Sequence, residues 1–327
     1  MTDYLVTGGA GFIGGALVER LVEDDHDVCV LDNFSRGVPE RLENIEDDIQ
    51  IVEADVRDPD QLREPCLQAE SILHLAAVNG TENFYEKPDQ VLEVGLKGTL
   101  NVMDFAVQGR CSQFLMASSS EVYHEPDTVP TDETEPLRIP DISNPRFSYS
   151  STKIIGESLT FHYLPDDIQR LMIRPHNVYG PSMGFEHVIP DFVEKAVQLD
   201  EEHDSQETVS FPIQGDGEQT RAFCHIDDAV EGIITVLENG DDQEIYNIGT
   251  ENEVTIGELA HKVAEIFGLE IIIEREDVPD GSTSRRCPDI SKIRELGFEP
   301  EVTLDAGLEE TLSWYEQYFR ENDFSGV

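Results

Sequence analysis

The segment that most constrains this chain is a glycine-rich stretch close to its N-terminus. Tyr4 to Thr7 is a short β-prone run, and a helical pattern with one apolar face extends from Phe12 to Glu23. Gly8 and Gly11 lie between the two segments and allow a tight turn and a close approach to a ligand. Gly14 lies within the helical segment and allows the helix to pack closely on the strand. The free N–H groups at the start of that helix suit a pyrophosphate. The stretch therefore predicts a strand, a phosphate-binding turn and a helix.

A second β-prone run indicates what the turn binds. Val28 to Leu31 ends in Asp32, about twenty residues after the glycines, and a polar loop is expected from Asn33 to Glu40. A carboxylate at this place accepts hydrogen bonds from both hydroxyls of an adenosine ribose and repels a 2′-phosphate. The pattern favours a dinucleotide, and NAD over NADP, although Arg36 leaves NADP open.

Strand-like and helical segments continue to alternate through the first half of the chain. Further β-prone runs are Ile49 to Glu53, Ser71 to Ala77 and Gln113 to Ala117, and the helical segments between them are Asp60 to Gln68 and Pro88 to Gln108. This alternation predicts an α/β fold of the Rossmann type, with a doubly wound parallel sheet and helices on both faces. Ligands are then expected beyond the carboxyl ends of the strands.

The second half of the chain mixes shorter elements and has no glycine fingerprint, which predicts a smaller C-terminal α/β lobe for the substrate. One of its helices is expected from Thr255, as the N-cap, to Phe267. We expect an NAD-binding domain over residues 1–175, with 223–256 returning to it, and a substrate-binding lobe made of 176–222 and 257–327.

The chain is strongly acidic, because its 327 residues carry 69 acidic and 22 basic side chains and a net charge of −47. The acids are spread through every segment, and one run, Asp200 to Glu207, is expected to be a solvated loop. This distribution predicts an acidic surface on a folded protein and makes nucleic acid and anionic membranes unsuitable partners. The composition resembles that of proteins from salt-in halophiles, where high ionic strength screens self-repulsion.

The cysteines and the absence of long apolar runs indicate the cellular compartment in which the protein is expected. The five cysteines are scattered, without a C-x-x-C pair, at positions 29, 66, 111, 224 and 287. They predict buried thiols in a reducing compartment, with no disulfide framework and no metal site. No signal-peptide pattern precedes the first strand and no run approaches a transmembrane length, so we expect a soluble, cytoplasmic protein.

Two residues on a predicted helix, Ser148 to Tyr163, suggest chemistry. Tyr149 and Lys153 are four residues apart and therefore share one face of that helix. A nearby cation stabilises a phenolate, so Lys153 and a positively charged nicotinamide would lower the pKa of Tyr149. Tyr149 can then take a proton from a substrate hydroxyl while hydride leaves for the cofactor. The segment Ser118 to Tyr123 adds hydroxyls that can bind the same oxygen.

As an ordered set, these segments resemble the extended short-chain dehydrogenase/reductase family, the NAD-dependent epimerases and dehydratases of nucleotide sugars. The resemblance covers nearly the whole chain and includes the later segments Arg174 to Pro181 and Gly215 to Phe223. It implies a nucleotide-diphosphate sugar as substrate, a UDP-sugar before others, and a homodimer. The catalytic residues that it implies are Ser119, Tyr149 and Lys153. The cofactor-binding residues are Gly8, Gly11, Phe12, Ile13, Gly14, Asp32, Asn33, Asp55, Val56, Leu75, Ala76, Ala77, Tyr149 and Lys153. The substrate-binding residues are Ser119, Ser120, Asn177, Arg221 and Arg286.

The reactions of such enzymes differ at the two positions after Ser119. Sugar 4,6-dehydratases carry an Asp-Glu pair there, whereas this chain has Ser120 and Glu121, so the acid that protonates a leaving hydroxyl is missing. UDP-glucuronate decarboxylases have a similar Ser-Glu pair, and simple 4-epimerases usually lack an acid at the position of Glu121. Glu121 is therefore a further catalytic candidate. His176 and His187 are candidates for acid/base groups or for structural and substrate-packing roles.

We predict an NAD-dependent nucleotide-sugar epimerase that oxidises C4 of the sugar transiently through the Ser/Tyr/Lys site. The alternatives left open are a UDP-glucuronate decarboxylase-like or a 4,6-dehydratase-like enzyme and a non-catalytic, NAD-binding regulatory protein. Gly95 is a departure, because many members of the family have Asn there. The sequence identifies neither the sugar nor the position that is inverted.

Overall fold

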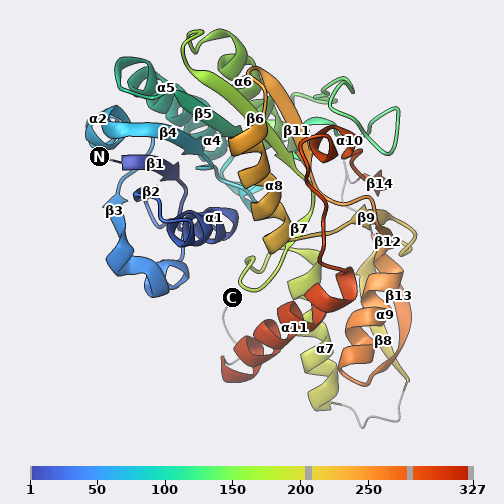
Figure 1. The fold of residues 1–327 in the computed structure, drawn as a ribbon. Helices are drawn as coiled ribbons and strands as arrows, with labels where there is room; N and C mark the ends of the chain where they lie inside the picture. The colour runs from blue at the N-terminus through green and yellow to red at the C-terminus, as the bar shows by residue number, and fades with distance from the viewer. Residues whose placement is uncertain (1, 203–207, 278–282, 323–327) are drawn as a thin grey trace.

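A seven-stranded parallel sheet forms the centre of the computed structural model, which describes residues 2–202, 208–277 and 283–322. The strand order is β11-β6-β5-β4-β1-β2-β3 (Figure 1). The bounds are β1 Thr2–Thr7, β2 Val28–Asp32, β3 Ile49–Glu53, β4 Ala69–His74, β5 Gln113–Ala117, β6 Gln169–Pro175 and β11 Glu244–Ile248. Each neighbouring pair is parallel. The predicted Rossmann-type fold is confirmed.

Helices cover both faces of this sheet, as the alternating pattern predicted. On one face lie α1 (Phe12–Glu23) and α8 (Ile226–Asn239), which share an apolar cluster with the strands. On the other lie α2 (Pro59–Gln68), α5 (Thr99–Gln108) and α6 (Ser148–His162). The five cysteines are buried, as expected.

The single helix expected from Pro88 to Gln108 is wrong in its middle. The structure has α4 (Pro88–Leu92), a wider π-helical turn (Glu93–Gly98) and then α5. This turn lies close to its neighbours, because a Cβ on Gly95 would stand 2.5 Å from the Cβ of Thr152 on α6. Gly95 therefore lies at a place where two helices are in near contact.

Two short elements were missed by the sequence analysis. A 3-10 helix occupies Pro39–Asp48, where a loop was expected to reach Glu40, and α3 spans Thr81–Glu86. Tertiary contacts stabilise both: Arg41 donates to the Ala10 carbonyl at 2.9 Å, and Phe84 of α3 stacks on Tyr149 with 5.3 Å between ring centres. Neither contact leaves a periodic signal in the sequence.

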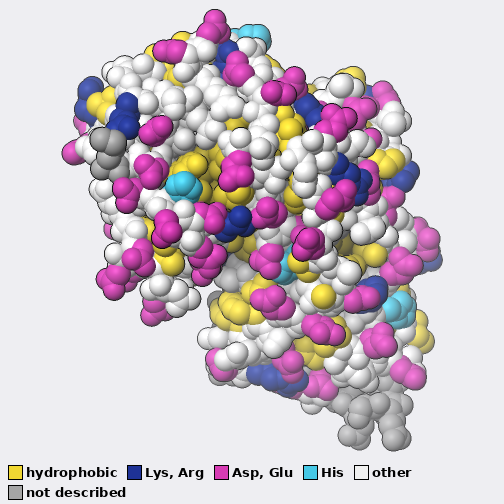
Figure 2. All heavy atoms as spheres, viewed as in Figure 1, with side chains coloured by type: hydrophobic (Ala, Val, Ile, Leu, Met, Phe, Trp, Pro, Cys, Tyr) yellow, Lys and Arg dark blue, Asp and Glu magenta, His cyan; other side chains and the backbone are white. Residues whose placement is uncertain are grey.

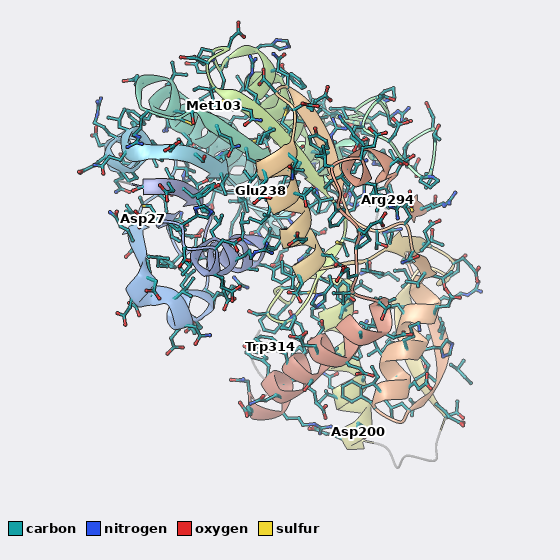
Figure 3. All side chains as sticks on the ribbon, viewed as in Figure 1. Asp27, Met103, Asp200, Glu238, Arg294 and Trp314 are labelled. Carbon is teal, nitrogen blue, oxygen red and sulfur yellow. The ribbon has the colours of Figure 1, made fainter. Side chains whose placement is uncertain are left out.

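A smaller α/β lobe lies beside the sheet and has its own apolar cluster, as predicted (Figure 1). Its members are α7 (Val188–Glu202), β8 (Thr208–Gln214), α9 (Ile256–Ile266), β13 (Glu270–Glu276) and α11 (Leu304–Glu321). The single tryptophan, Trp314, lies on α11 in this lobe (Figure 3). The helix α8 and the strand β11 pack with the large sheet. The exact domain boundaries remain a prediction.

The ends of two helices in the smaller lobe can be compared with the sequence predictions. Thr255 is the N-cap of α9 and forms a capping box with Glu258, so that prediction is confirmed. The acidic loop expected from Asp200 is wrong at its start, because α7 continues to Glu202. The rest of that loop, 203–207, lies outside the described residues.

The visible surface is strongly acidic. Figure 2 shows Asp and Glu side chains scattered over the whole visible face, with fewer Lys and Arg side chains between them. Within the described ranges, no helix is long and apolar enough to cross a membrane.

This surface charge leads to a prediction about salt. The net charge of −47 destabilises the compact state by self-repulsion, and the Debye length falls from about 10 Å at 0.1 M salt to about 3 Å at 1 M. We therefore expect the Tm, followed by circular dichroism, to rise by several degrees as KCl is raised to roughly molar levels. Sucrose of equal osmolality is the control, because it leaves the charges unscreened. A Tm independent of KCl would contradict the proposal of a halophilic surface.

Candidate active site

A cavity of about 500 Å³ lies at the carboxyl ends of the central strands. It collects nearly all of the residues that the sequence predicted for the site. Those lining it are Gly8, Gly11, Phe12, Ile13, Gly14, Asp32, Asn33, Asp55, Val56, Leu75, Ala76, Ala77, Ser119, Ser120, Glu121, Tyr149, Lys153, Asn177 and Arg286. Arg221 is the predicted residue that does not reach the cavity wall.

The glycine turn provides a cradle that side chains would fill. Gly8 has a φ of +73°, and a Cβ there would stand 2.8 Å from the backbone nitrogen of Ala76. A Cβ on Gly14 would stand 2.2 Å from the carbonyl oxygen of Gly8, a distance that no real contact allows. Among the described residues, no side chain caps α1 at its N-cap, Gly11. Its first-turn N–H groups can therefore bind a pyrophosphate.

Asp32 is fixed at the end of β2 for the adenosine part of a dinucleotide. Its side chain accepts hydrogen bonds from the backbone N–H of Ala10 at 3.0 Å and of Phe34 at 2.9 Å. Each oxygen keeps a lone pair for a ribose hydroxyl. Arg36, the residue that left NADP open, also lines the cavity, and its guanidinium lies 3.7 Å from the carboxylate of Glu186.

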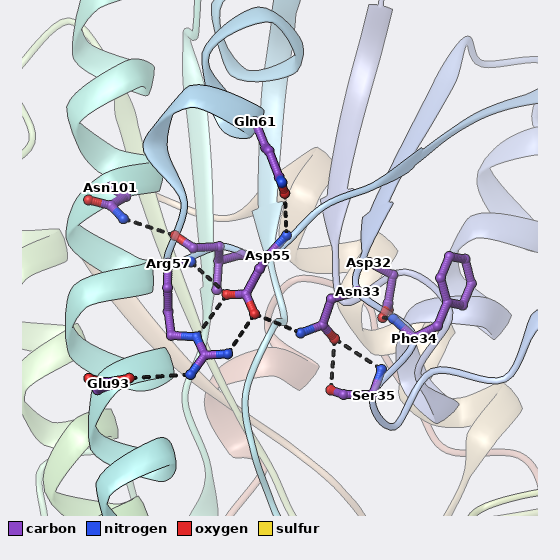
Figure 4. A network of polar contacts seen from close by, with 10 residues as sticks. Asp32, Asn33, Phe34, Ser35, Asp55, Arg57, Gln61, Glu93 and Asn101 are labelled. Carbon is purple, nitrogen blue, oxygen red and sulfur yellow. Dashed lines mark hydrogen bonds and ion pairs between the residues drawn. The ribbon is translucent and has the colours of Figure 1, made fainter.

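A second polar network ties the loops after β2 and β3 together (Figure 4). The Asn33 amide donates to the Asp55 carboxylate at 3.0 Å, and Arg57 pairs with the same carboxylate at 2.7 Å. The hydrogen bonds from Arg57 hold the pKa of Asp55 well below its usual range, so Asp55 is ionised at neutral pH. The backbone of Asp55 and Val56 is thereby held at the cavity wall. Together with the glycine cradle, these contacts fit NAD.

Tyr149 and Lys153 lie on one face of α6, inside the cavity wall. The Tyr149 hydroxyl is hydrogen-bonded with Ser119, and Lys153 Nζ lies 5.5 Å from the centre of the Tyr149 ring. Lys153 Nζ also donates to the Ala117 carbonyl at 2.7 Å. Burial raises the pKa of Tyr149 despite the hydrogen bond from Ser119, and burial lowers the pKa of Lys153 to about 8. A further positive charge is needed beside the phenol, and the nicotinamide ring of NAD supplies one.

Arginines surround Glu121, which lines the cavity two residues after Ser119. Arg286 pairs with the Glu121 carboxylate at 2.7 Å, and Arg146 lies 3.8 Å from it. Burial raises the pKa of Glu121, but the charges of Arg286 and Arg146 outweigh burial and the net pKa is below its usual range. Glu121 is therefore ionised and cannot donate a proton as a general acid near neutral pH.

Arg221 lies behind this pair. Its guanidinium donates to the carbonyls of Thr220 at 2.7 Å and Thr283 at 2.8 Å. Burial and the charge of Arg286 lower the pKa of Arg221 to about 10. The Nε atom of Arg286 is buried and has no hydrogen-bond partner among the described residues. Crowded guanidinium groups with a spare donor suit an anionic ligand.

The two histidines have different environments. His176 is 1% exposed, its Nε2 lies 3.1 Å from the Asn247 side-chain oxygen, and burial lowers its pKa to about 3. It is neutral and does not line the cavity, which favours its structural role. His187 does line the cavity, and burial lowers its pKa as well.

The sequence analysis missed Arg146, Phe84 and Glu186, all of which line the cavity. The signal that could have found Arg146 is composition, because basic residues are few in this chain. The sequence analysis predicted no element for the segments that contain Phe84 and Glu186.

Comparisons with known proteins agree with this site. The model of the NAD dependent epimerase/dehydratase family matches residues 4–249. The chain is 33% identical over 329 residues to a UDP-N-acetyl-alpha-D-glucosaminuronate decarboxylase from Bacillus cytotoxicus, covering 98% of each protein. It is similar in structure to a dTDP-glucose 4,6-dehydratase from Streptomyces venezuelae with NAD bound (TM-score 0.84, 29% identity, 98% of each chain). It is also similar to a UDP-glucose 4-epimerase from Thermotoga maritima with UDP-glucose (TM-score 0.83, 27% identity, 97% of this chain and 99% of that one).

The glycine cradle gives a prediction for the cofactor. Gly14→Ala places a methyl group against the Gly8 carbonyl, so we expect the affinity for NAD, measured by calorimetry, to fall by about tenfold or more. Gly15→Ala is the matched control, because its Cβ would face the side chain of Arg41 at 3.2 Å. Equal affinities in the two variants would contradict the assignment of this turn to NAD.

Proposed function

The chain belongs to the NAD dependent epimerase/dehydratase family, and on that basis we propose that it is a nucleotide-sugar decarboxylase. It would oxidise a nucleotide-linked uronic acid at C4 and release the 6-carboxyl group as carbon dioxide. The observation that carries the proposal is the ionised Glu121 between Arg286 and Arg146, with Arg221 behind them. A neutral sugar gives such a cluster only the diphosphate to bind, whereas a uronic acid adds a carboxylate. The similarity to the Bacillus decarboxylase supports the same choice.

The first step uses the residues at the end of β5 and on α6. NAD bound in the cavity would supply the acceptor for hydride from C4 of the sugar and the donor for its return. Tyr149 takes the proton of the 4-hydroxyl, and Ser119 holds that oxygen beside it. Lys153 stabilises by its charge the phenolate form of Tyr149 that accepts this proton.

Oxidation at C4 prepares the loss of the carboxyl group. The product of the first step is a β-keto acid, so the bond between C5 and C6 can break with its electron pair passing toward the C4 oxygen. Carbon dioxide departs, and water provides the proton that completes C5. Tyr149 then gives its proton back to the C4 oxygen, and the net change is loss of carbon dioxide without net oxidation. The arginines hold the charged groups in place throughout.

Epimerisation at C4, the function predicted from the sequence, is the second candidate. The structural similarity to the Thermotoga 4-epimerase supports it, and the first step is the same. In that reaction the 4-keto sugar turns in the cavity and takes hydride on its other face. Dehydration is less well supported, because Ser120 stands where a proton donor is needed.

A product assay separates these reactions. The protein would be incubated in roughly molar KCl with UDP-glucuronate, its N-acetylglucosamine analogue, UDP-glucose and dTDP-glucose separately, and the products analysed by NMR. We expect a uronic acid to lose its carboxyl group, and Tyr149→Phe to lower kcat by about a thousandfold. An isomer of unchanged mass would overturn the decarboxylase proposal in favour of the epimerase.

The arginine cluster gives a sharper prediction. Arg146→Met removes a charge beside Glu121, so we expect kcat/KM for the uronic acid substrate to fall about a hundredfold. Arg138→Met is the matched control. Like Arg146, Arg138 lies beside carboxylate groups, those of Asp127 and Glu135, but it does not line the cavity. An equal effect of the two substitutions would remove the support that Arg146 gives to the proposal.

A further inference from the structure

A third side chain on α6 continues the face that carries Tyr149 and Lys153. Glu157 follows at the next interval of four residues, so the three side chains form one row along the helix. Glu157 is 3% exposed and does not line the cavity. Ionised residues are seldom buried so deeply unless they are paired, so its partners indicate what it does.

The row meets consecutive residues at the end of β5. Lys153 donates to the carbonyl of Ala117, as described above, and the hydroxyl of Ser118 donates to the Glu157 carboxylate at 2.5 Å. Ser119, the next residue, is the one that is hydrogen-bonded with the catalytic phenol. Lys153 and Glu157 therefore fix α6 against the two residues that directly precede Ser119.

The opposite side of Glu157 is bound by β6. Arg174 donates to its two carboxylate oxygens, at 2.8 Å from Nε and 2.7 Å from the terminal nitrogen, and is itself 2% exposed. The same guanidinium donates to the Tyr123 hydroxyl at 2.7 Å. A buried, two-point pair with further hydrogen bonds holds the carboxylate in one orientation.

The charges around Lys153 are few. Tyr149 and Glu157 face it from its own helix and His74 faces it from β4, while Arg174 of β6 reaches it through Glu157. His74 is neutral, because burial lowers its pKa to about 3. Burial lowers the pKa of Lys153, and among the described residues Glu157 is the carboxylate whose charge opposes that effect.

We propose that Glu157 is a positioning residue for the reaction: it aligns α6 with the end of β5 and supports the positive charge of Lys153 beside Tyr149. The proposal rests on the first step of the proposed function, oxidation at C4. The epimerase candidate has the same first step. Glu157 acts through Ser118 and Lys153 and touches neither substrate nor cofactor.

The charge of Lys153 can be measured directly, because the chain has only six lysines. The protein would carry ¹³C at the lysine Cε atoms, and NMR spectra would be recorded across pH with Lys153→Met to assign the signal. We expect Glu157→Gln, which keeps the shape of the side chain, to lower the pKa of Lys153 by about one pH unit. Asp228→Asn is the control, because Asp228 is also a buried carboxylate, which accepts from the backbone N–H of Glu301 and Val302. It should leave Lys153 unchanged.

Turnover gives the second readout. In Glu157→Gln, Lys153 loses its proton at a lower pH, so the alkaline limb of the kcat profile moves to lower pH while KM stays near the wild-type value. Glu157→Asp keeps the negative charge and should return the alkaline limb of the kcat profile to its wild-type pH. Its shorter side chain reaches Ser118 less well. The NMR titration needs no substrate, so it stands even if the proposed decarboxylation fails.

Glu157→Gln leaves Arg174 buried without its charged partner, which destabilises folding. If that variant does not fold, the double variant Glu157→Gln/Arg174→Met removes both charges and is titrated in its place. A lowered pKa of Lys153 in the variant that folds supports the proposal. A pKa equal to that of the wild type overturns it.

Discussion

The parallel arrangement of the central strands is the constraint on which the site depends. Because β1, β2, β4 and β5 all run the same way, their carboxyl ends meet at one edge of the sheet. The glycine turn, Asp32 and Ser119 follow three of these strands and so reach one cavity. The helix α6 then places Tyr149 and Lys153 over that edge, and its contacts with β5 fix where they lie. Cofactor binding and proton transfer thus share one framework.

Charge gives the site its second property. The chain has a net charge of −47, yet Arg286 and Arg146 lie beside Glu121 in the cavity wall, and the charge of Arg221 acts on the same carboxylate. Burial and mutual repulsion act on these arginines in the protein alone, as the lowered pKa of Arg221 reflects. Binding of an anionic substrate relieves that repulsion. An acidic surface also repels anions in general, so the arginines concentrate attraction where we propose that a nucleotide sugar binds.

The sequence predicted what depends on local spacing and missed what depends on tertiary contact. The glycine turn, Asp32 and the four-residue interval from Tyr149 to Lys153 are local patterns, and the structure brings all of them to the cavity. Phe84 could not be found in this way, because α3 is short and its stacking on Tyr149 joins distant segments. The π-helical turn at Gly95 likewise reflects contact with α6 rather than any pattern in its own segment.

In the proposed reaction, C4 is oxidised transiently, the carboxyl group is lost, and C4 is then reduced again. The most direct measurement uses UDP-glucuronate that carries deuterium at C4, in roughly molar KCl, with mass spectrometry and NMR of the product. We expect a product that has lost the carboxyl group and keeps the deuterium at C4, because the label leaves that carbon as a hydride and returns to it. A product that keeps its carboxyl group, or one that has lost the label from C4, would contradict it.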